Sequence, residues 1–220
     1  MELADQTTAY IKSLLQERSE YIQEIEAYAQ DHDIPIMELD GMETMLQFLR
    51  IQQPKLILEI GTAIGYSAIR MMHALPNARV ISLERDQERA LIAKKNVAKV
   101  SLQSRFDLIQ GDALELAEEV ENYGPFDVLF IDAAKGQYER FFSLYEPMVK
   151  EGGVIFSDNV LFKGMIASET EPDSRGLRAM VRKIRLYNEN LMNNPRFDSM
   201  LLPVGDGLMI SRKNQIDREK

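Results

Sequence analysis

The sequence predicts an α/β fold built on an open, mostly parallel sheet, and two observations support this prediction. Short runs rich in aliphatic and β-branched residues recur along the chain, at about 55–60, 79–84, 106–110, 126–131 and 153–157. Helical stretches separate these runs, at about 65–74, 86–100, 113–122 and 137–148. Strands that alternate with helices in this way form right-handed βαβ units, with helices on both faces of the sheet.

The segments on either side of this alternating region complete the predicted architecture. Apolar residues at roughly helical spacing predict one helix over about 1–30 and a second over about 39–50, which ends before Pro54. A long helix is expected near 174–193, followed by two strands joined by a turn at Gly205-Asp206-Gly207. These two strands form an antiparallel hairpin on the sheet edge, which makes seven strands in all. The polar stretch 163–175 is a candidate mobile lid.

Length and composition limit the class of protein. A chain of 220 residues fits a single domain, 1–220, with the helices of 1–50 packed on its core. The absence of cysteine excludes disulfides, thiolate zinc sites and a cysteine nucleophile, and fits a reducing compartment. Because no signal peptide or membrane-spanning run is visible, we expect a cytoplasmic protein without a membrane partner. The net charge of −9 argues against a large non-specific nucleic-acid surface.

Acidic residues lie at or just past the carboxyl end of each predicted parallel strand. They are Glu59, Glu84, Asp112, Asp132 and Asp158. In open α/β sheets, ligands bind at this edge. A row of carboxylates is costly there unless a cation or hydroxyl donors meet it. The row therefore predicts a ligand with positive charge, with hydroxyl groups, or with a metal ion.

The loop after the first strand reads EIGTAIGYS, from Glu59 to Ser67. Gly61 permits a turn with positive φ, and Gly65 lets a ligand approach the following helix. The G-x-x-x-G spacing is not the dinucleotide pattern, and no phosphate-binding lysine follows it. An acid before the glycines repels pyrophosphate but suits a cationic ligand. The alternative is a plain strand–turn–helix junction.

The next two acids are suited to a nucleoside. Glu84 follows Gly61 by 23 residues and can accept both hydrogen bonds of a ribose diol. The alternative for Glu84 is a carboxylate at a helix start, but its distance from the glycine loop favours the ribose. Asp112, before the small Ala113, can meet an adenine amino group or cap the helix that follows, and these two roles are compatible.

The last two strands supply oxygen ligands and a lysine. Asp132 and the pair Asp158-Asn159 converge if the two strands are neighbours. Two carboxylates and an amide oxygen suit a hard cation such as Mg²⁺. Lys135 could then act as general base. The alternative is two helix caps and a surface lysine. The two histidines, which are far apart and not at strand ends, are expected to face solvent.

A local excess of positive charge lies in the predicted long helix. The run from 175 to 185 holds five basic residues and no acid. It is either a solvated helix face or a patch that contacts phosphates beside the active-site edge. In the second interpretation, the residues proposed to contact RNA are Lys163, Arg175, Arg178 and Arg182.

On these motifs the sequence resembles the class I S-adenosylmethionine (SAM)-dependent methyltransferases. More narrowly, it is similar to the cation-dependent O-methyltransferases that include the catechol and caffeoyl-CoA enzymes. EIGTAIGYS, GDA, FIDAAKGQY and SDNV fall in order, and the resemblance runs from about Ile34 to Arg212. It implies the Rossmann-like fold of that class, SAM and Mg²⁺ as cofactors, and a homodimer. The chain departs from many relatives at Ala134, where they carry a second acid.

The resemblance also implies roles for individual residues. SAM would contact Met37, Glu59, Gly61, Gly65, Ser67, Glu84, Asp112, Ala113 and Asp132. Within that set, Glu59 to Ser67 would hold the methionine half and Glu84 the ribose, while Asp112 and Ala113 would flank the adenine. Mg²⁺ would be bound by Asp132, Asp158 and Asn159, and the catalytic residues would be Lys135 and Asp132.

Within that family the sequence is most similar to bacterial enzymes that methylate 5-hydroxyuridine at the wobble position of tRNA, giving 5-methoxyuridine. This base presents two neighbouring oxygens, as catechol does, and both could chelate one Mg²⁺. Two alternatives stand beside this hypothesis: methylation of a small catechol-like metabolite, and a non-catalytic nucleotide-binding regulator. The complete set of ligands and lysine weighs against the regulator.

Overall fold

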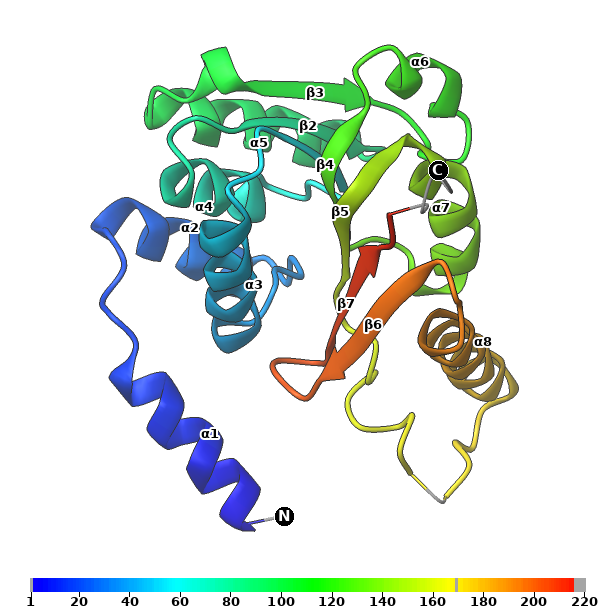
Figure 1. Ribbon diagram of the computed structural model, residues 1–220. Coiled ribbons are helices and arrows are strands. Elements are labelled where there is room, and N and C mark those ends of the chain that lie inside the picture. Colours follow the sequence, from blue (N-terminus) through cyan, green and yellow to red (C-terminus); the bar gives the residue numbers. More distant parts are fainter. Residues whose placement is uncertain (1, 169, 216–220) are drawn as a thin grey trace.

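The computed structural model describes residues 2–168 and 170–215 (Figure 1). Residues 1 and 216–220 of the predicted domain, and residue 169 of the predicted lid, lie outside the described residues. One mixed sheet runs through the molecule. Its strands are β1 (Leu56–Ile60), β2 (Arg79–Glu84), β3 (Phe106–Gln110), β4 (Phe126–Ile131), β5 (Val149–Ser157), β6 (Phe197–Leu202) and β7 (Leu208–Lys213).

The sheet has the order β3-β2-β1-β4-β5-β7-β6. The first five strands of this order are parallel, and β7 runs antiparallel to both β5 and β6. The predicted fold class is therefore confirmed, including the antiparallel hairpin at the edge. The strand order changes direction at β1: β2 and β3 lie on one side of it, and β4 and β5 lie on the other. The loops that follow β1 and β4 therefore diverge there and leave a crevice at the carboxyl ends of the strands.

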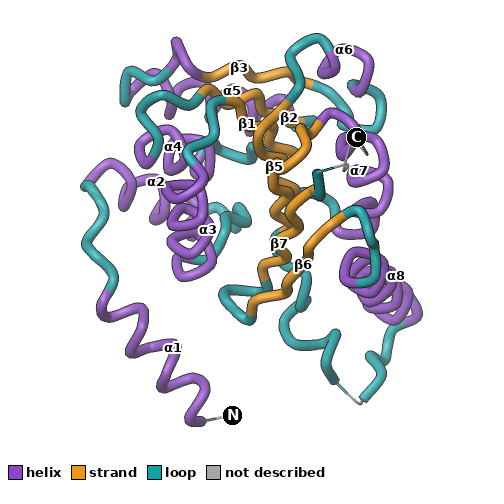
Figure 2. Tube along the Cα trace, in the orientation of Figure 1, coloured by secondary structure: helices purple, strands orange, loops and turns teal. Residues whose placement is uncertain are grey.

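Helices cover both faces of the sheet (Figure 2). They are α1 (Glu2–Leu14), α2 (Glu20–Asp31), α3 (Leu39–Gln52), α4 (Tyr66–Ala74), α5 (Gln87–Lys99), α6 (Ala117–Glu121), α7 (Tyr138–Tyr145) and α8 (Arg175–Met192). One apolar core joins α2, α3 and α4 to the sheet, and a second core joins α7 and α8 to the other face. No helix of the described chain is both long and apolar enough to cross a membrane.

The prediction of one helix over 1–30 was wrong. Residues 15–19 separate α1 from α2, and the carbonyl of Ser19 accepts the first backbone bonds of α2. Arg18 turns back onto α2, where its Nη2 donates to Glu26 at 2.7 Å. The apolar residues of the two helices have different surroundings: Leu14 of α1 is 65% exposed, whereas Ile22 of α2 is buried. In Figure 1, α1 projects from the body of the molecule, to which it is joined near its carboxyl end by ion pairs from Lys12 to Glu38 and Asp40.

Two further helices are shorter than predicted. The helix expected at 113–122 is only α6, because Asp112 closes a turn before it. Its carboxylate accepts from Leu114 N at 2.9 Å and its carbonyl from Glu115 N at 2.8 Å, so Asp112 caps a turn rather than α6. The helix expected at 137–148 ends at Tyr145, and a single 3₁₀ turn containing Pro147 follows.

Candidate active site

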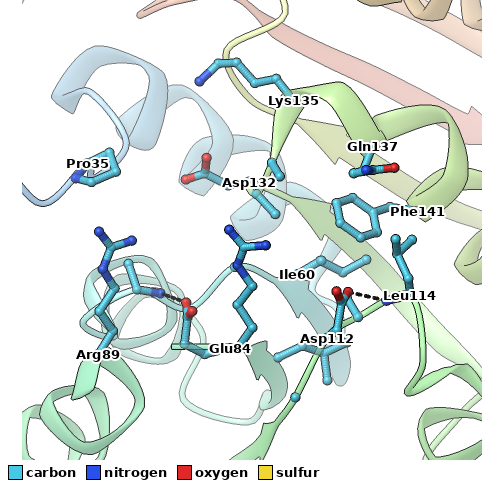
Figure 3. Close-up of a pocket in the computed structure, with 18 of the residues that line it drawn as sticks. Pro35, Ile60, Glu84, Arg89, Asp112, Leu114, Asp132, Lys135, Gln137 and Phe141 are labelled. Atoms are coloured by element: carbon cyan, nitrogen blue, oxygen red, sulfur yellow. Dashed lines mark hydrogen bonds between the residues drawn. The ribbon is translucent and has the colours of Figure 1, made fainter. Parts of the chain in front are cut away.

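A cavity of about 360 Å³ opens where the loops after β1, β2, β3 and β4 meet. Its volume lies in the range of sites that bind small molecules. Figure 3 shows Glu84 and Asp112 at one end and Asp132 and Lys135 at the other. The predicted site residues that line the cavity are Gly61, Glu84, Asp112, Ala113, Asp132, Lys135 and Asn159. Those that do not line it are Met37, Glu59, Gly65, Ser67 and Asp158.

Gly61 lines the cavity where the loop after β1 packs against the end of β4. It has a φ of 101°, and a Cβ added there would lie 1.9 Å from the carbonyl oxygen of Asp132. Only glycine can therefore fit between the loop after β1 and the end of β4. Gly65 has a φ of 84° and packs against Ala93 of α5, where an added Cβ would lie 3.3 Å away. The two glycines keep the loop close to both neighbouring elements.

Glu84 is fixed at the end of β2 by backbone hydrogen bonds. One carboxylate oxygen accepts from Ala63 N and the other from Asp86 N, both at 2.8 Å. The side chain is 8% exposed and lines the cavity. Each carboxylate oxygen has a second lone pair, so the group can still accept hydrogen bonds from a diol. This geometry suits the ribose role that the resemblance implies.

Glu59 lies below the cavity and is fully buried. Its two carboxylate oxygens accept hydrogen bonds from the hydroxyls of Ser67 and Ser82. Burial raises the pKa of Glu59 to about 7, although the two serine hydrogen bonds oppose the shift. Glu59 and Ser67, both predicted for the methionine half of the cofactor, are thus in contact with each other, but neither lines the cavity. Met37, also buried, packs beneath Gly41 of α3, outside the cavity.

The oxygen ligands predicted for a metal converge at the ends of β4 and β5, which are adjacent strands. The amide nitrogen of Asn159 donates to Asp158 at 3.0 Å, and Lys135 Nζ donates to Asn159 Oδ1 at 2.7 Å. Burial raises the pKa of Asp132 to about 6, against the opposing effect of Lys135. Burial and then the charge of Asp132 raise the pKa of Asp158, and Asp206 adds to that shift.

The chemistry of this donor set fits a divalent cation. Burial raises the pKa values of the neighbouring Asp132 and Asp158, and the charge of Lys135 offsets this only in part, so a bound cation would stabilise both carboxylates in their charged form. Carboxylate and amide oxygens are the ligands that Mg²⁺ takes in proteins. No group of three or more His, Cys, Asp or Glu side chains in the described chain could hold a metal. A metal site here would therefore need an oxygen ligand of another kind beside Asp132 and Asp158, and the amide oxygen of Asn159 could supply it.

Sequence reasoning missed several residues that line the cavity. Arg85 and Arg89 follow Glu84, and Figure 3 shows Arg89 between Glu84 and Pro35. Leu114 and Phe141 form an apolar wall near Asp112. Arg85 lies just before the N-cap of α5 and Arg89 in its first turn, positions where charged residues usually face water. A pattern along the chain could not reveal that this helix start turns toward the cavity.

The basic run of α8 serves partly to hold the loop before it. Arg178 Nη1 donates to the carbonyls of Pro172 and Asp173, both at 2.8 Å. Arg185 donates to the carbonyls of Ile166 at 2.8 Å and Ser168 at 3.0 Å. Arg175 and Arg182 are exposed and line the same hollow beside the loop. Lys163 is also exposed, and its backbone amide donates to Asp206.

A sheet of this order, with an antiparallel seventh strand inserted beside the fifth, is the fold of the class I methyltransferases. A family model described as O-methyltransferase matches residues 12–214. The chain therefore belongs to the O-methyltransferase family. A catechol O-methyltransferase from Niastella koreensis is 37% identical over 163 residues, which cover 71% of each chain.

Solved structures agree with this assignment. A candidate caffeoyl-CoA O-methyltransferase from Staphylococcus aureus is 34% identical and superposes with a TM-score of 0.89, covering 95% of this chain and 100% of its own. An O-methyltransferase from Bacillus cereus, in complex with S-adenosylhomocysteine (SAH), is 28% identical with a TM-score of 0.80. It covers 95% of this chain and 97% of its own.

Proposed function

We propose that this protein transfers the methyl group of SAM to one hydroxyl of a small catechol-like substrate. The observation that carries the proposal is one cavity lined both by Glu84 and Asp112, where a nucleoside would bind, and by Asp132 and Asn159, where a cation would bind. We call these two parts the nucleoside end and the cation end. The similarity to a catechol O-methyltransferase supports this class of acceptor over others. A substrate with two adjacent oxygens matches a cation end built for oxygen coordination.

The cofactor half of the proposal uses side chains that already line the cavity. Glu84 would accept hydrogen bonds from the ribose hydroxyls. Asp112 is exposed at the cavity and would accept a hydrogen bond from the adenine amino group, while Leu114 and Phe141 supply apolar contact. A related enzyme in complex with SAH supports the same cofactor here. Glu59, held by Ser67 below the loop, would contribute negative charge for the methionine end.

Asp132, Asp158 and Asn159 would hold Mg²⁺. When bound, Mg²⁺ would orient the two acceptor oxygens and lower the pKa of the reacting hydroxyl. Lys135 Nζ is placed beside Asn159 and would take the hydroxyl proton. The acceptor oxygen then forms its bond to the methyl carbon as the carbon–sulfur bond breaks, and SAH is left.

A second acceptor, wobble 5-hydroxyuridine in tRNA, is favoured by one specific observation. The exposed Arg175 and Arg182 line a hollow next to the loop that follows Asn159, where phosphates could be contacted. The base offers the same pair of neighbouring oxygens as a catechol.

We also infer a homodimer, since Tyr10 and Leu14 of α1 are 64% and 65% exposed and offer an apolar contact surface.

One experiment tests the proposal. Wild-type protein is incubated with methyl-labelled SAM and catechol, caffeoyl-CoA or tRNA lacking the 5-methoxy group, each with and without a chelator. We expect label in a diphenol that disappears with chelator. Label in tRNA alone would show that tRNA, not a small diphenol, is the acceptor. Transfer that continues in the presence of chelator would refute the role of Mg²⁺. No transfer to any acceptor would refute the proposed methyltransferase activity.

A further inference from the structure

The segment 158–163, which carries two of the proposed metal ligands, has a strained backbone. Three of its residues that are not glycine have positive φ: Asn159 at 57°, Phe162 at 49° and Lys163 at 54°. Asparagine tolerates this conformation, but residues such as phenylalanine and lysine adopt it mainly where surrounding structure enforces it. The first of these residues is Asn159, so its unusual backbone sets where its amide group lies.

The support for this segment comes largely from the β6–β7 turn. Val160 N donates to the carbonyl of Gly207 at 3.1 Å, and Leu161 N donates to the carbonyl of Asp206 at 2.8 Å. The carboxylate of Asp206 accepts a further bond from Lys163 N. Asp206 therefore binds the backbone on both sides of Phe162, through its main chain and its side chain.

The turn approaches the segment closely enough to require glycine. A Cβ added to Gly207, whose φ is 90°, would lie 2.7 Å from Leu161 N and 2.5 Å from Leu161 Cγ. The turn is anchored on its other side, where Gly205 N donates to Asp40 Oδ2 at 3.2 Å. Asp40 is in turn paired with Lys12 of α1 at 3.2 Å. Both sides of the turn are thus fixed.

We propose that Asp206 is a positioning residue for the acceptor end of the site. Its two bonds hold the left-handed turn of 158–163, and that turn directs the Asn159 amide to Asp158 and Lys135. This inference rests on the proposed function for the role of Asn159. Asp206 itself lies outside the lining of the cavity and touches neither cofactor nor acceptor.

The test compares Asp206→Ala with Asp206→Asn. Asparagine keeps the oxygen that accepts from Lys163 N but removes the charge, so it separates the hydrogen bond from the electrostatic effect. Asp198→Ala is the matched control, because Asp198 is an exposed acid on β6 of the same hairpin. Three quantities are measured on the full chain: Mn²⁺ affinity by electron paramagnetic resonance, SAH affinity by calorimetry, and amide hydrogen exchange over 158–166.

For Asp206→Ala we expect Mn²⁺ affinity to fall about 10- to 100-fold, the range for residues that orient metal ligands. Exchange at Lys163 should accelerate while SAH affinity stays at the wild-type value. Asp206→Asn and Asp198→Ala should behave as wild type in all three. Rescue by asparagine is the result that a general loss of stability would not produce.

Three results would overturn the inference. They are wild-type Mn²⁺ affinity and exchange in Asp206→Ala, an equal loss in Asp206→Asn, or a parallel loss of SAH affinity. Failure of the proposed function would give a different result, because wild-type protein would then transfer no methyl group or bind no Mn²⁺. The exchange measurement would still decide whether Asp206 holds the segment.

Discussion

Lys135 Nζ donates a hydrogen bond of 2.7 Å to Oδ1 of Asn159, the same oxygen that is proposed to coordinate the metal. An ammonium group and a divalent cation on one oxygen would repel each other. In the loaded enzyme Lys135 would therefore leave Asn159, lose its proton to solvent, and turn to the acceptor hydroxyl as the neutral amine. The pair thus couples occupation of the cation end to the availability of the lysine.

This coupling makes a prediction for Lys135→Met. Methyl transfer should fall by about 10²- to 10⁴-fold, the usual contribution of a general base. Mn²⁺ affinity should be equal to or higher than that of wild type, because a competing cation is removed. Labelled methyl transfer and Mn²⁺ titration measure the two effects. Reduced Mn²⁺ affinity with full activity would contradict the assignment, and Lys94→Met, at an exposed position on α5, is the control.

Glu84→Ala should act on the other end of the cavity. It removes the proposed acceptor of the ribose hydroxyls, and one charge-assisted hydrogen bond contributes about 1.5–3 kcal/mol. SAH affinity should therefore fall by about 10- to 100-fold, with Mn²⁺ affinity unchanged. Calorimetry, well below the unfolding temperature, measures the SAH and Mn²⁺ affinities. The control is Glu88→Ala, at an exposed position in the first turn of α5. Unaltered SAH binding would remove Glu84 from the cofactor site.

The buried carboxyl of Glu59 predicts how stability depends on pH. Its pKa is about 7 in the folded protein against an ordinary value of 4.5, so the unfolded chain loses the proton first as pH rises. The free energy of unfolding should fall between about pH 4.5 and 7, by up to about 3 kcal/mol, and level off above. Asp132 and Asp158 shift in the same direction.

Glu59→Gln should make that decline smaller, since glutamine does not titrate. Urea unfolding of the protein without cofactor, at intervals from pH 5 to pH 8, measures the slope for wild type and variant. Glu119→Gln, on the exposed surface of α6, should leave the slope as it is. Parallel curves for wild type and Glu59→Gln would show that another group carries the effect.

Gly61→Ala should be among the most damaging single changes. The new Cβ would lie 1.9 Å from the carbonyl oxygen of Asp132, and the φ of 101° is unfavourable for alanine. We expect destabilisation above about 3 kcal/mol, the range of severe backbone and packing defects. Gly176→Ala in α8 is the control, because its Cβ would meet nothing within 4 Å. Similar melting temperatures for the two variants would contradict the close approach.

The exposed arginines of α8 distinguish the two acceptors. Replacing both Arg175 and Arg182 by glutamate should leave transfer to catechol unchanged, because neither lines the cavity. If tRNA is an acceptor, its affinity should fall about tenfold or more and its salt dependence should weaken. Electrophoretic mobility shifts at two salt concentrations measure this. Equal tRNA binding by wild type and the double variant would remove the patch from consideration.

The periodicity of the sequence predicted the sheet because buried parallel strands are short, apolar and bounded by acids. It also placed Asp132 and Asp158 together, since it was enough to know that their strands are neighbours. It could not show that α1 and α2 are separate, because exposed Leu14 and buried Ile22 look alike in a pattern. Nor could it show that Arg89 faces the cavity, or that Asp206 holds a segment more than 40 residues earlier, since both depend on tertiary contacts.

The placement of β1 between β2 and β4 separates the two chemical tasks along the chain. The polar residues that would bind the nucleoside follow β1, β2 and β3, with Phe141 of α7 added from beyond β4, whereas those that would meet the acceptor follow β4 and β5 and rest against the β6–β7 turn. The segment after Asn159 and the β6–β7 turn hold none of the residues proposed to bind the cofactor, so they can change length or composition without altering how it is held. New acceptor specificities can therefore be engineered by exchanging residues 160–175 together with the β6–β7 turn, as one unit, between members of the family.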